Sequence, residues 1–150
     1  MNVLKVLVVT VTIGLLLAAC GPSNQEWYET HQLEGIAIRF AAKVDGADNT
    51  SRGNLPPVIQ DMRDIQAELL ILTTQEDTPE AAVDPLLKAY RAMGEIIDGF
   101  ASFSDVSALR DLSDAAQDAR VLREVQQIID GEDALFRAWE DLRLSLEIDQ

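Results

Sequence analysis

Histidine and cysteine are side chains that commonly supply nucleophiles, bases and metal ligands, and this chain of 150 residues has one of each. The histidine is His31. Its neighbours one helical turn away are Trp27 and Gly35, which offer neither a ligand nor a carboxylate to orient the ring. Glu34, three residues on, could pair with it. We therefore expect a surface or lightly paired histidine and assign no catalytic residue.

The ligand patterns of cofactors that bind inside helical bundles are missing. A di-iron carboxylate site needs two Glu-x-x-His motifs, and the residue three before His31 is Tyr28. Covalent haem needs Cys-x-x-Cys-His, which does not occur. Non-covalent haem could use His31 with Met62 or Met93 as ligands, but both methionines fall on apolar helix faces, where methionine usually fills a core. No cofactor is therefore predicted.

Carboxylates are plentiful, and some lie close together in the sequence. Examples are Asp61, Asp64, Glu68, Glu132 and Asp133. Such groups could hold calcium weakly, but they are more typical of a solvated helix face. No Gly-x-Ser-x-Gly, Ser-x-x-Lys or Walker motif occurs. The sequence therefore predicts neither a metal site nor an enzyme.

The single cysteine, Cys20, follows a short apolar leader. After Lys5, residues 6–19 form an uncharged run that as a helix would span about 21 Å, less than the ~30 Å core of a bilayer. The pattern is typical of an export signal, residues 1–19, rather than of a membrane span. The leader ends in Leu17-Ala18-Ala19, small residues directly before the cysteine.

These last residues, Leu17-Ala18-Ala19-Cys20, resemble the lipobox of bacterial lipoproteins. The resemblance implies cleavage between Ala19 and Cys20, lipidation of the Cys20 thiol, and acylation of the new amino terminus. The exported protein would then be attached to a membrane through acyl chains on Cys20. In a cell with two membranes, Gly21 after the cysteine resembles a signal for the periplasmic face of the outer membrane. Otherwise the expected address is the outer face of the cytoplasmic membrane.

Charge narrows the range of partners. Without residues 1–19, which include Lys5, the chain has 11 Lys and Arg against 26 Asp and Glu, a net charge of −15. Nucleic acid is excluded as an expected partner, because no basic patch could neutralise phosphates. Electrostatic docking on anionic lipid is excluded for the same reason, so the acyl chains must provide the attachment.

Apolar residues recur at three- and four-residue spacing along four segments, with no strand-like alternation. The predicted helices cover 26–44, 56–74, a third segment that starts at Pro79 or Asp84 and ends near Phe100, and 114–147. A loop is expected at 45–54, a break at 101–104 and a short helix at 105–112. Thr78 is the expected cap of the third helix and Ser113 of the last. The last helix is expected to continue through Gly131, because Ile128, Leu135 and Leu142 keep one phase.

The predicted fold is an all-α, up-and-down bundle of about four helices after a lipoprotein signal peptide. Residues 20–25 would be the lipidated cysteine and a short tether, and residues 26–150 a single acidic domain. This length suits one compact domain rather than two.

A second, weaker apolar stripe on the first helix carries the functional hypothesis. Trp27, His31 and Ile38 share the face opposite Leu33. They are either a frayed turn packed against a loop, or a contact surface for an envelope protein or a second copy of the chain. The leading hypothesis is a non-enzymatic, lipid-anchored envelope protein that presents a helical surface to a protein partner. The alternative is a helical bundle that binds a small ligand or a divalent cation.

Overall fold

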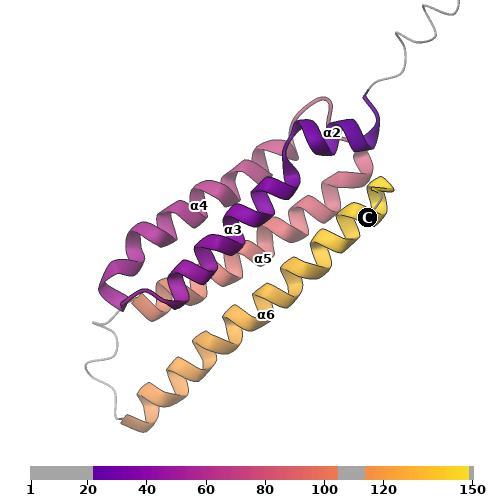
Figure 1. Cartoon of the computed structure of the whole chain (residues 1–150). Helices are drawn as coiled ribbons and strands as arrows, with labels where there is room; N and C mark the ends of the chain where they lie inside the picture. Colours follow the sequence, from indigo (N-terminus) through magenta and orange to yellow (C-terminus); the bar gives the residue numbers. More distant parts are fainter. Residues whose placement is uncertain (1–21, 105–113, 149–150) are drawn as a thin grey trace, which may run out of the picture.

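The protein is seen here as a computed structural model that describes residues 22–104 and 114–148. In these ranges the regular elements are α2 (Asn24–Thr30), α3 (Leu33–Asp48), a 3-10 turn η1 (Arg52–Asn54), α4 (Leu55–Leu72), α5 (Glu80–Ser104) and α6 (Asp114–Leu146). The predicted all-α class, with about four main helices, is confirmed. Consecutive helices pack side by side, most extensively α5 with α6 (Figure 1). No helix in the described ranges is long and apolar enough to cross a membrane.

The chain becomes helical earlier than expected. A reciprocal cap starts α2: the Ser23 hydroxyl accepts a hydrogen bond from the backbone N–H of Glu26, and the Glu26 carboxylate accepts one from the N–H of Ser23. Asn24 and Gln25, predicted to belong to the tether, therefore lie in α2. The spacing of Ser23 and Glu26 is a capping signal that the sequence carries.

The single helix predicted at 26–44 is wrong, because the chain breaks between α2 and α3. Gln32 adopts the left-handed conformation, with φ of 51°. On a continuous helix Trp27 would lie opposite Leu33, but with the break Trp27 is 1% exposed and joins the core. Burying a large apolar side chain contributes about 2–3 kcal/mol, which exceeds the ~1–2 kcal/mol cost of a left-handed residue. Beyond the break, α3 continues past the predicted end at Val44 to Asp48.

The helices α4 and α5 form as predicted, with different ends. The helix α4 begins at Leu55 with proline in its first turn, where the missing N–H costs nothing. The Thr78 hydroxyl donates to the carbonyl of Leu72 at 2.5 Å, in place of the predicted cap on α5. Pro85 lies inside α5, so the helix does not restart there.

The break predicted at 101–104 is wrong, since α5 runs to Ser104. The Arg52 guanidinium lies 4.0 Å from the centre of the Phe103 ring, and Phe103 packs against the core. This cation–π contact stabilises the last turn through a residue far away in the sequence. The predicted short helix at 105–112 and the cap at Ser113 lie outside the described residues.

The last helix is continuous through Gly131, as predicted. It is the longest described helix, and its N-terminal end projects past the ends of the others in Figure 1. Gly131 is buried against α5, where a Cβ would lie 2.7 Å from the Ile96 side chain and 3.3 Å from the Ala92 carbonyl oxygen. The glycine therefore permits a close helix crossing.

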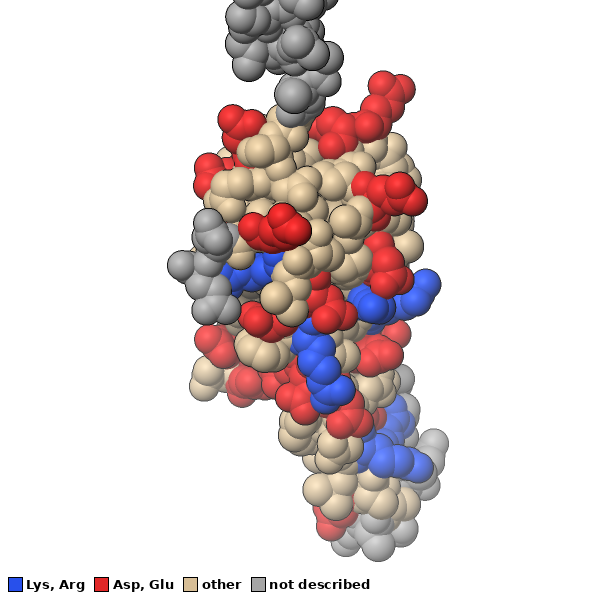
Figure 2. Space-filling model, turned by 90° about the vertical axis from the view of Figure 1, so that its right-hand side faces the viewer, with Lys and Arg blue, Asp and Glu red and all other residues tan. Residues whose placement is uncertain are grey.

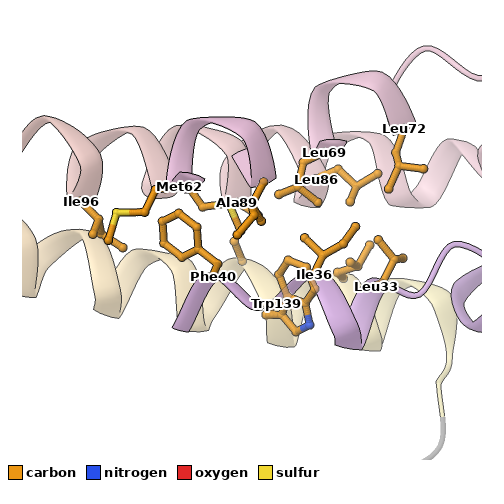
Figure 3. Packing of buried hydrophobic residues seen from close by; sticks show 14 of the residues in the cluster. Leu33, Ile36, Phe40, Met62, Leu69, Leu72, Leu86, Ala89, Ile96 and Trp139 are labelled. Atoms are coloured by element: carbon orange, nitrogen blue, oxygen red, sulfur yellow. The ribbon is translucent and has the colours of Figure 1, made fainter. Parts of the chain in front are cut away.

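The core lies between α3, α4, α5 and α6, whose side chains point into one shared interior in Figure 3. Met62 and Met93 are fully buried in it, as expected for methionines on apolar helix faces. Trp139 from α6 and Phe40 from α3 belong to the same buried cluster. The bundle is nevertheless open along one side, because α3 and α6 are not in extensive contact with each other.

Candidate binding groove

An open groove of about 390 Å³ lies between α3 and α6, with Ile96 of α5 at its base. We call this hollow the α3–α6 groove. Its α3 wall consists of Glu34, Ala37, Phe40, Ala41, Val44 and Asp45, and its α6 wall of Glu132, Leu135, Phe136, Trp139, Glu140 and Arg143. On both walls the spacing of these residues is that of one helix face. The lining is therefore apolar in the middle and carboxylate-rich at the edges.

Aromatic side chains from α6 make two different contributions to the groove. Trp139 is only 9% exposed and forms part of the core, whereas Phe136 is 68% exposed beside it. The buried indole nitrogen of Trp139 has no hydrogen-bond partner among the described residues. A buried N–H without a hydrogen-bond partner lowers the free energy of unfolding. This unsatisfied group belongs to a residue that lines the solvent-open α3–α6 groove.

The edge of the groove where α3 ends is acidic. Partial burial raises the pKa of Glu132, and the nearby charges of Asp48, Asp45 and Asp133 raise it further. Asp45, Asp48 and Glu132 form no ion pair within the described ranges. This edge is therefore a concentration of negative charge that no Lys or Arg of the described residues neutralises by an ion pair.

The opposite edge of the groove contains a hydrogen bond between α2 and α3. The Tyr28 hydroxyl donates to the Glu34 carboxylate at 2.9 Å. Burial, with this hydrogen bond, raises the pKa of Tyr28 to about 12. The nearby Trp139 indole acts in the opposite direction and lowers the pKa of Tyr28, although it does not form a hydrogen bond of normal geometry with the Tyr28 hydroxyl. Arg143 lines the groove at this edge and is the one basic residue of its lining.

A stripe of exposed apolar side chains continues the groove along α6. Leu122 and Phe136 are 70% and 68% exposed, and Val125 and Ile129 between them are also exposed. These four residues, which we call the α6 stripe, recur at helical spacing on one face. Phe136 belongs to both the stripe and the groove, so the two adjoin there, with Glu132 and Asp133 on the helical turn between Ile129 and Phe136.

A second hollow, on another side of the α5–α6 pair, differs in chemistry. Its lining includes Lys88, Arg91, Glu95, Arg137 and Asp141, so charges of both signs face each other there. Lys88 is paired with both Asp84 and Asp141, at 2.9 and 3.5 Å. This balanced, ion-paired surface offers much less apolar contact area than the α3–α6 groove.

The three residues of the predicted contact surface do not form one exposed patch. Trp27 is buried, with its ring 5.0 Å from the His31 ring. The prediction that Trp27 belongs to an exposed contact surface is therefore wrong, because the break at Gln32 turns α2 inward. Ile38 is 62% exposed. Its helical neighbours Glu34 and Asp45 line the groove, so Ile38 lies on the same face of α3.

His31 pairs with Asp77 rather than with Glu34, the carboxylate that its spacing in the sequence suggested. Its Nε2 lies 3.2 Å from the Asp77 carboxylate, in the connection between α4 and α5, while Glu34 is engaged by Tyr28. No local spacing indicates a partner so distant in sequence. Cys20 and Ala19, predicted for lipidation and cleavage, lie outside the described residues.

The clustered carboxylates of α4 are paired and solvated. Glu68 accepts two hydrogen bonds from Arg39, and Asp61 accepts one from Lys43 at 2.5 Å. Within residues 22–104 and 114–148, no three His, Cys, Asp or Glu side chains group closely enough to hold a metal ion. Carboxylates are distributed over the face that Figure 2 shows, rather than gathered in one cluster.

The groove itself was missed at the level of sequence, although α6 carried a signal. Ile129 and Phe136 lie about 100° around the helix from Ile128 and Leu135, and Val125 lies about 60° from Ile128 on the same side. The apolar face of α6 is therefore wider than one neighbouring helix can cover.

Comparison with known protein families, curated proteins and solved structures finds no match to this chain.

Proposed function

We propose that this chain is a non-enzymatic, lipid-anchored protein of the bacterial envelope that binds a protein partner in the α3–α6 groove. The observation that carries the proposal is the apolar lining of the groove together with the exposed apolar side chains of the adjoining α6 stripe. Large apolar surfaces on a soluble domain commonly mark a binding site. Phe136 and Leu122 are mostly exposed on this surface and would be covered in a complex.

The position of α2 indicates which end of the bundle an anchor at Cys20 would hold at the membrane. The side chain of Asn24 donates to the carbonyl of Leu146 at 3.2 Å, so the start of α2 lies beside the end of α6. If Cys20 carries acyl chains, the four residues to Asn24 reach at most about 14 Å. The end of the bundle where α6 finishes would then lie next to the membrane (Figure 1). The α6 stripe would project away from the membrane toward a partner.

Site-specific photocrosslinking in the native host tests the binding surface. A photoreactive amino acid replaces Phe136 in the groove lining or Ile38 beside it, and Ile71, which is 59% exposed on α4, serves as the matched control. We expect a defined crosslinked partner from the two groove positions and not from position 71. The crosslink should disappear when Leu135→Asp is introduced into the groove wall. Equal crosslinking at all three positions, or none, would overturn the proposal.

The anchor is tested separately by labelling and fractionation. Wild-type protein should incorporate a labelled fatty acid and sediment with membranes, whereas Cys20→Ser should remain unlabelled and uncleaved. Mature protein that is cleaved but carries no lipid would contradict the anchor and leave the groove proposal intact.

A further inference from the structure

We infer that the occupant of the α3–α6 groove is a cationic amphipathic α-helix of the partner protein, about three turns long. The inference rests on the proposed function of the groove as a protein-binding surface. It adds the chemistry of the bound segment, which length, lining and charge each indicate.

The two walls of the groove match in length. Their lining residues run from Glu34 to Asp45 on α3 and from Glu132 to Arg143 on α6. Each wall therefore covers twelve residues, or about 18 Å at 1.5 Å per residue. Asp45 influences the pKa of Glu132, so the two helices run in opposite directions past each other. A straight trough between two such helices fits three turns of a further helix, which would complete the open side of the bundle.

The lining suits the apolar face of a helix. Ala37 and Ala41, one turn apart on α3, leave room for a close approach. Leu135 and Phe136 supply the facing apolar contacts from α6. Helix-in-groove recognition uses apolar anchors at three- and four-residue spacing, and these walls present complementary positions at that spacing.

The negative charge at the edges of the groove favours a bound helix with basic residues on its flanks. The groove's edges contain four carboxylates, from Glu34, Asp45, Glu132 and Glu140, against one guanidinium, from Arg143. None of these carboxylates forms an ion pair with another described residue. Lys and Arg beside the apolar anchors of a bound helix would neutralise them, and this complementarity provides specificity and speeds association.

A second copy of the chain fits the groove less well. The whole chain has a formal net charge of −14, so another copy would bring a further excess of carboxylates to an acidic edge. Like charges across an interface oppose association. Self-association is therefore an outcome that the experiment below must distinguish.

The experiment measures peptide binding to the mature, lipidated protein in neutral detergent. The probe is an 18-residue amphipathic peptide with leucine on one face and lysine on its flanks, without tryptophan. The control peptide has the same leucines with glutamate in place of lysine. In a Trp27→Phe variant, fluorescence reports on Trp139 in the groove, because the chain has two tryptophans.

We expect the lysine peptide to bind and to change Trp139 fluorescence, and the glutamate peptide not to bind. The double substitution Glu132→Lys and Glu140→Lys should weaken binding at least about tenfold. The matched control, Asp64→Lys and Glu76→Lys, makes the same charge change away from the groove lining and should leave the dissociation constant within about twofold. Circular dichroism confirms that each variant folds.

Three outcomes overturn the inference. Equal weakening by the two double variants would indicate binding to general negative charge. Binding of the glutamate peptide would refute a cationic occupant. A dimer in analytical ultracentrifugation that prevents the lysine peptide from binding would identify a second copy as the occupant. If the groove crosslinks to a partner but the lysine peptide does not bind, this inference fails while the proposed function stands.

Discussion

Gly131 of α6 lies against the backbone of α5 at Ile96: a Cβ on Gly131 would be 3.2 Å from the Ile96 nitrogen. A reciprocal contact exists about one helical turn further along, where a Cβ on Gly99 of α5 would lie 2.6 Å from the Ile128 side chain. Each helix therefore contributes a glycine where the other comes closest. This pair of glycines explains why α5 and α6 pack so extensively despite the helix-weakening effect of glycine.

Gly131→Ala should destabilise the protein. Alanine favours a helix by about 1 kcal/mol over glycine, but overpacking against backbone atoms typically costs ~1–3 kcal/mol. We expect a net loss of about 1 kcal/mol in the free energy of unfolding, measured by urea denaturation with circular dichroism.

The matched control is Gly46→Ala in α3, where nothing lies within 4 Å of an added Cβ. That substitution should stabilise the protein by up to about 1 kcal/mol, because the propensity gain is unopposed. Equal stabilisation by both substitutions would show that α5 and α6 do not meet at Gly131.

Gln32→Gly should stabilise the protein by up to about 1 kcal/mol. Gln32 has a φ of 51°, which glycine adopts without the steric cost that a Cβ imposes. Thermal unfolding of Gln32→Gly and Gln32→Val gives a test of sign. The valine variant should unfold at a lower temperature than wild type, since β-branching is poorly tolerated at positive φ. A lower midpoint for the glycine variant would mean that α2 and α3 form one continuous helix.

Glu132→Gln should raise the melting temperature at neutral pH. The folded state raises the pKa of Glu132 through burial and its acidic neighbours, so the folded protein holds this proton more tightly than the unfolded chain. Stability therefore falls as pH rises from the ordinary value of 4.5 through the raised pKa. Glutamine removes that loss, and a rise of about 1–2 °C is expected for a surface site.

The gain should disappear below pH 4.5, where Glu132 is protonated in both states. Glu76→Gln, in the exposed connection after α4, is the control and should leave the melting temperature unchanged. A gain of the same size at acidic and neutral pH would contradict the electrostatic explanation.

Tyr28 should ionise only near pH 12. Burial and its hydrogen bond to Glu34 raise the pKa from the ordinary value of 10.0 to about 12. The folded state then holds the phenolic proton more tightly, so this contribution to stability is complete below pH 10 and is lost as pH rises through about 12. Ultraviolet titration of tyrosinate in a Tyr90→Phe background isolates Tyr28, because the chain has two tyrosines.

Glu34→Gln in the same background should lower the pKa of Tyr28, since it removes the negative charge that opposes ionisation. If the titration curve is the same with and without Glu34, the hydrogen bond between Tyr28 and Glu34 does not form in solution.

The sequence by itself determined the helical class and the course of α4, α5 and α6. Apolar periodicity is a local property, and each of these helices buries a stripe that its own residues define. The unbroken phase from Ile128 to Leu142 predicted the continuity of α6 through Gly131, although it could not show that the glycine is needed for contact with Ile96. The cap at Ser23 was also readable from the spacing of Ser23 and Glu26.

Only the tertiary structure decided where α2 breaks and where the bundle stays open. The turn at Gln32 is favourable because it lets Trp27 reach a core built by other helices, and no local pattern contains that gain. The α3–α6 groove depends on two helices about ninety residues apart in sequence, between Val44 and Leu135; α3 packs on α4 and α6 packs on α5, without closing on each other. Periodicity shows which face of a helix is apolar, whereas only the packing of the whole chain decides which part of that face stays exposed.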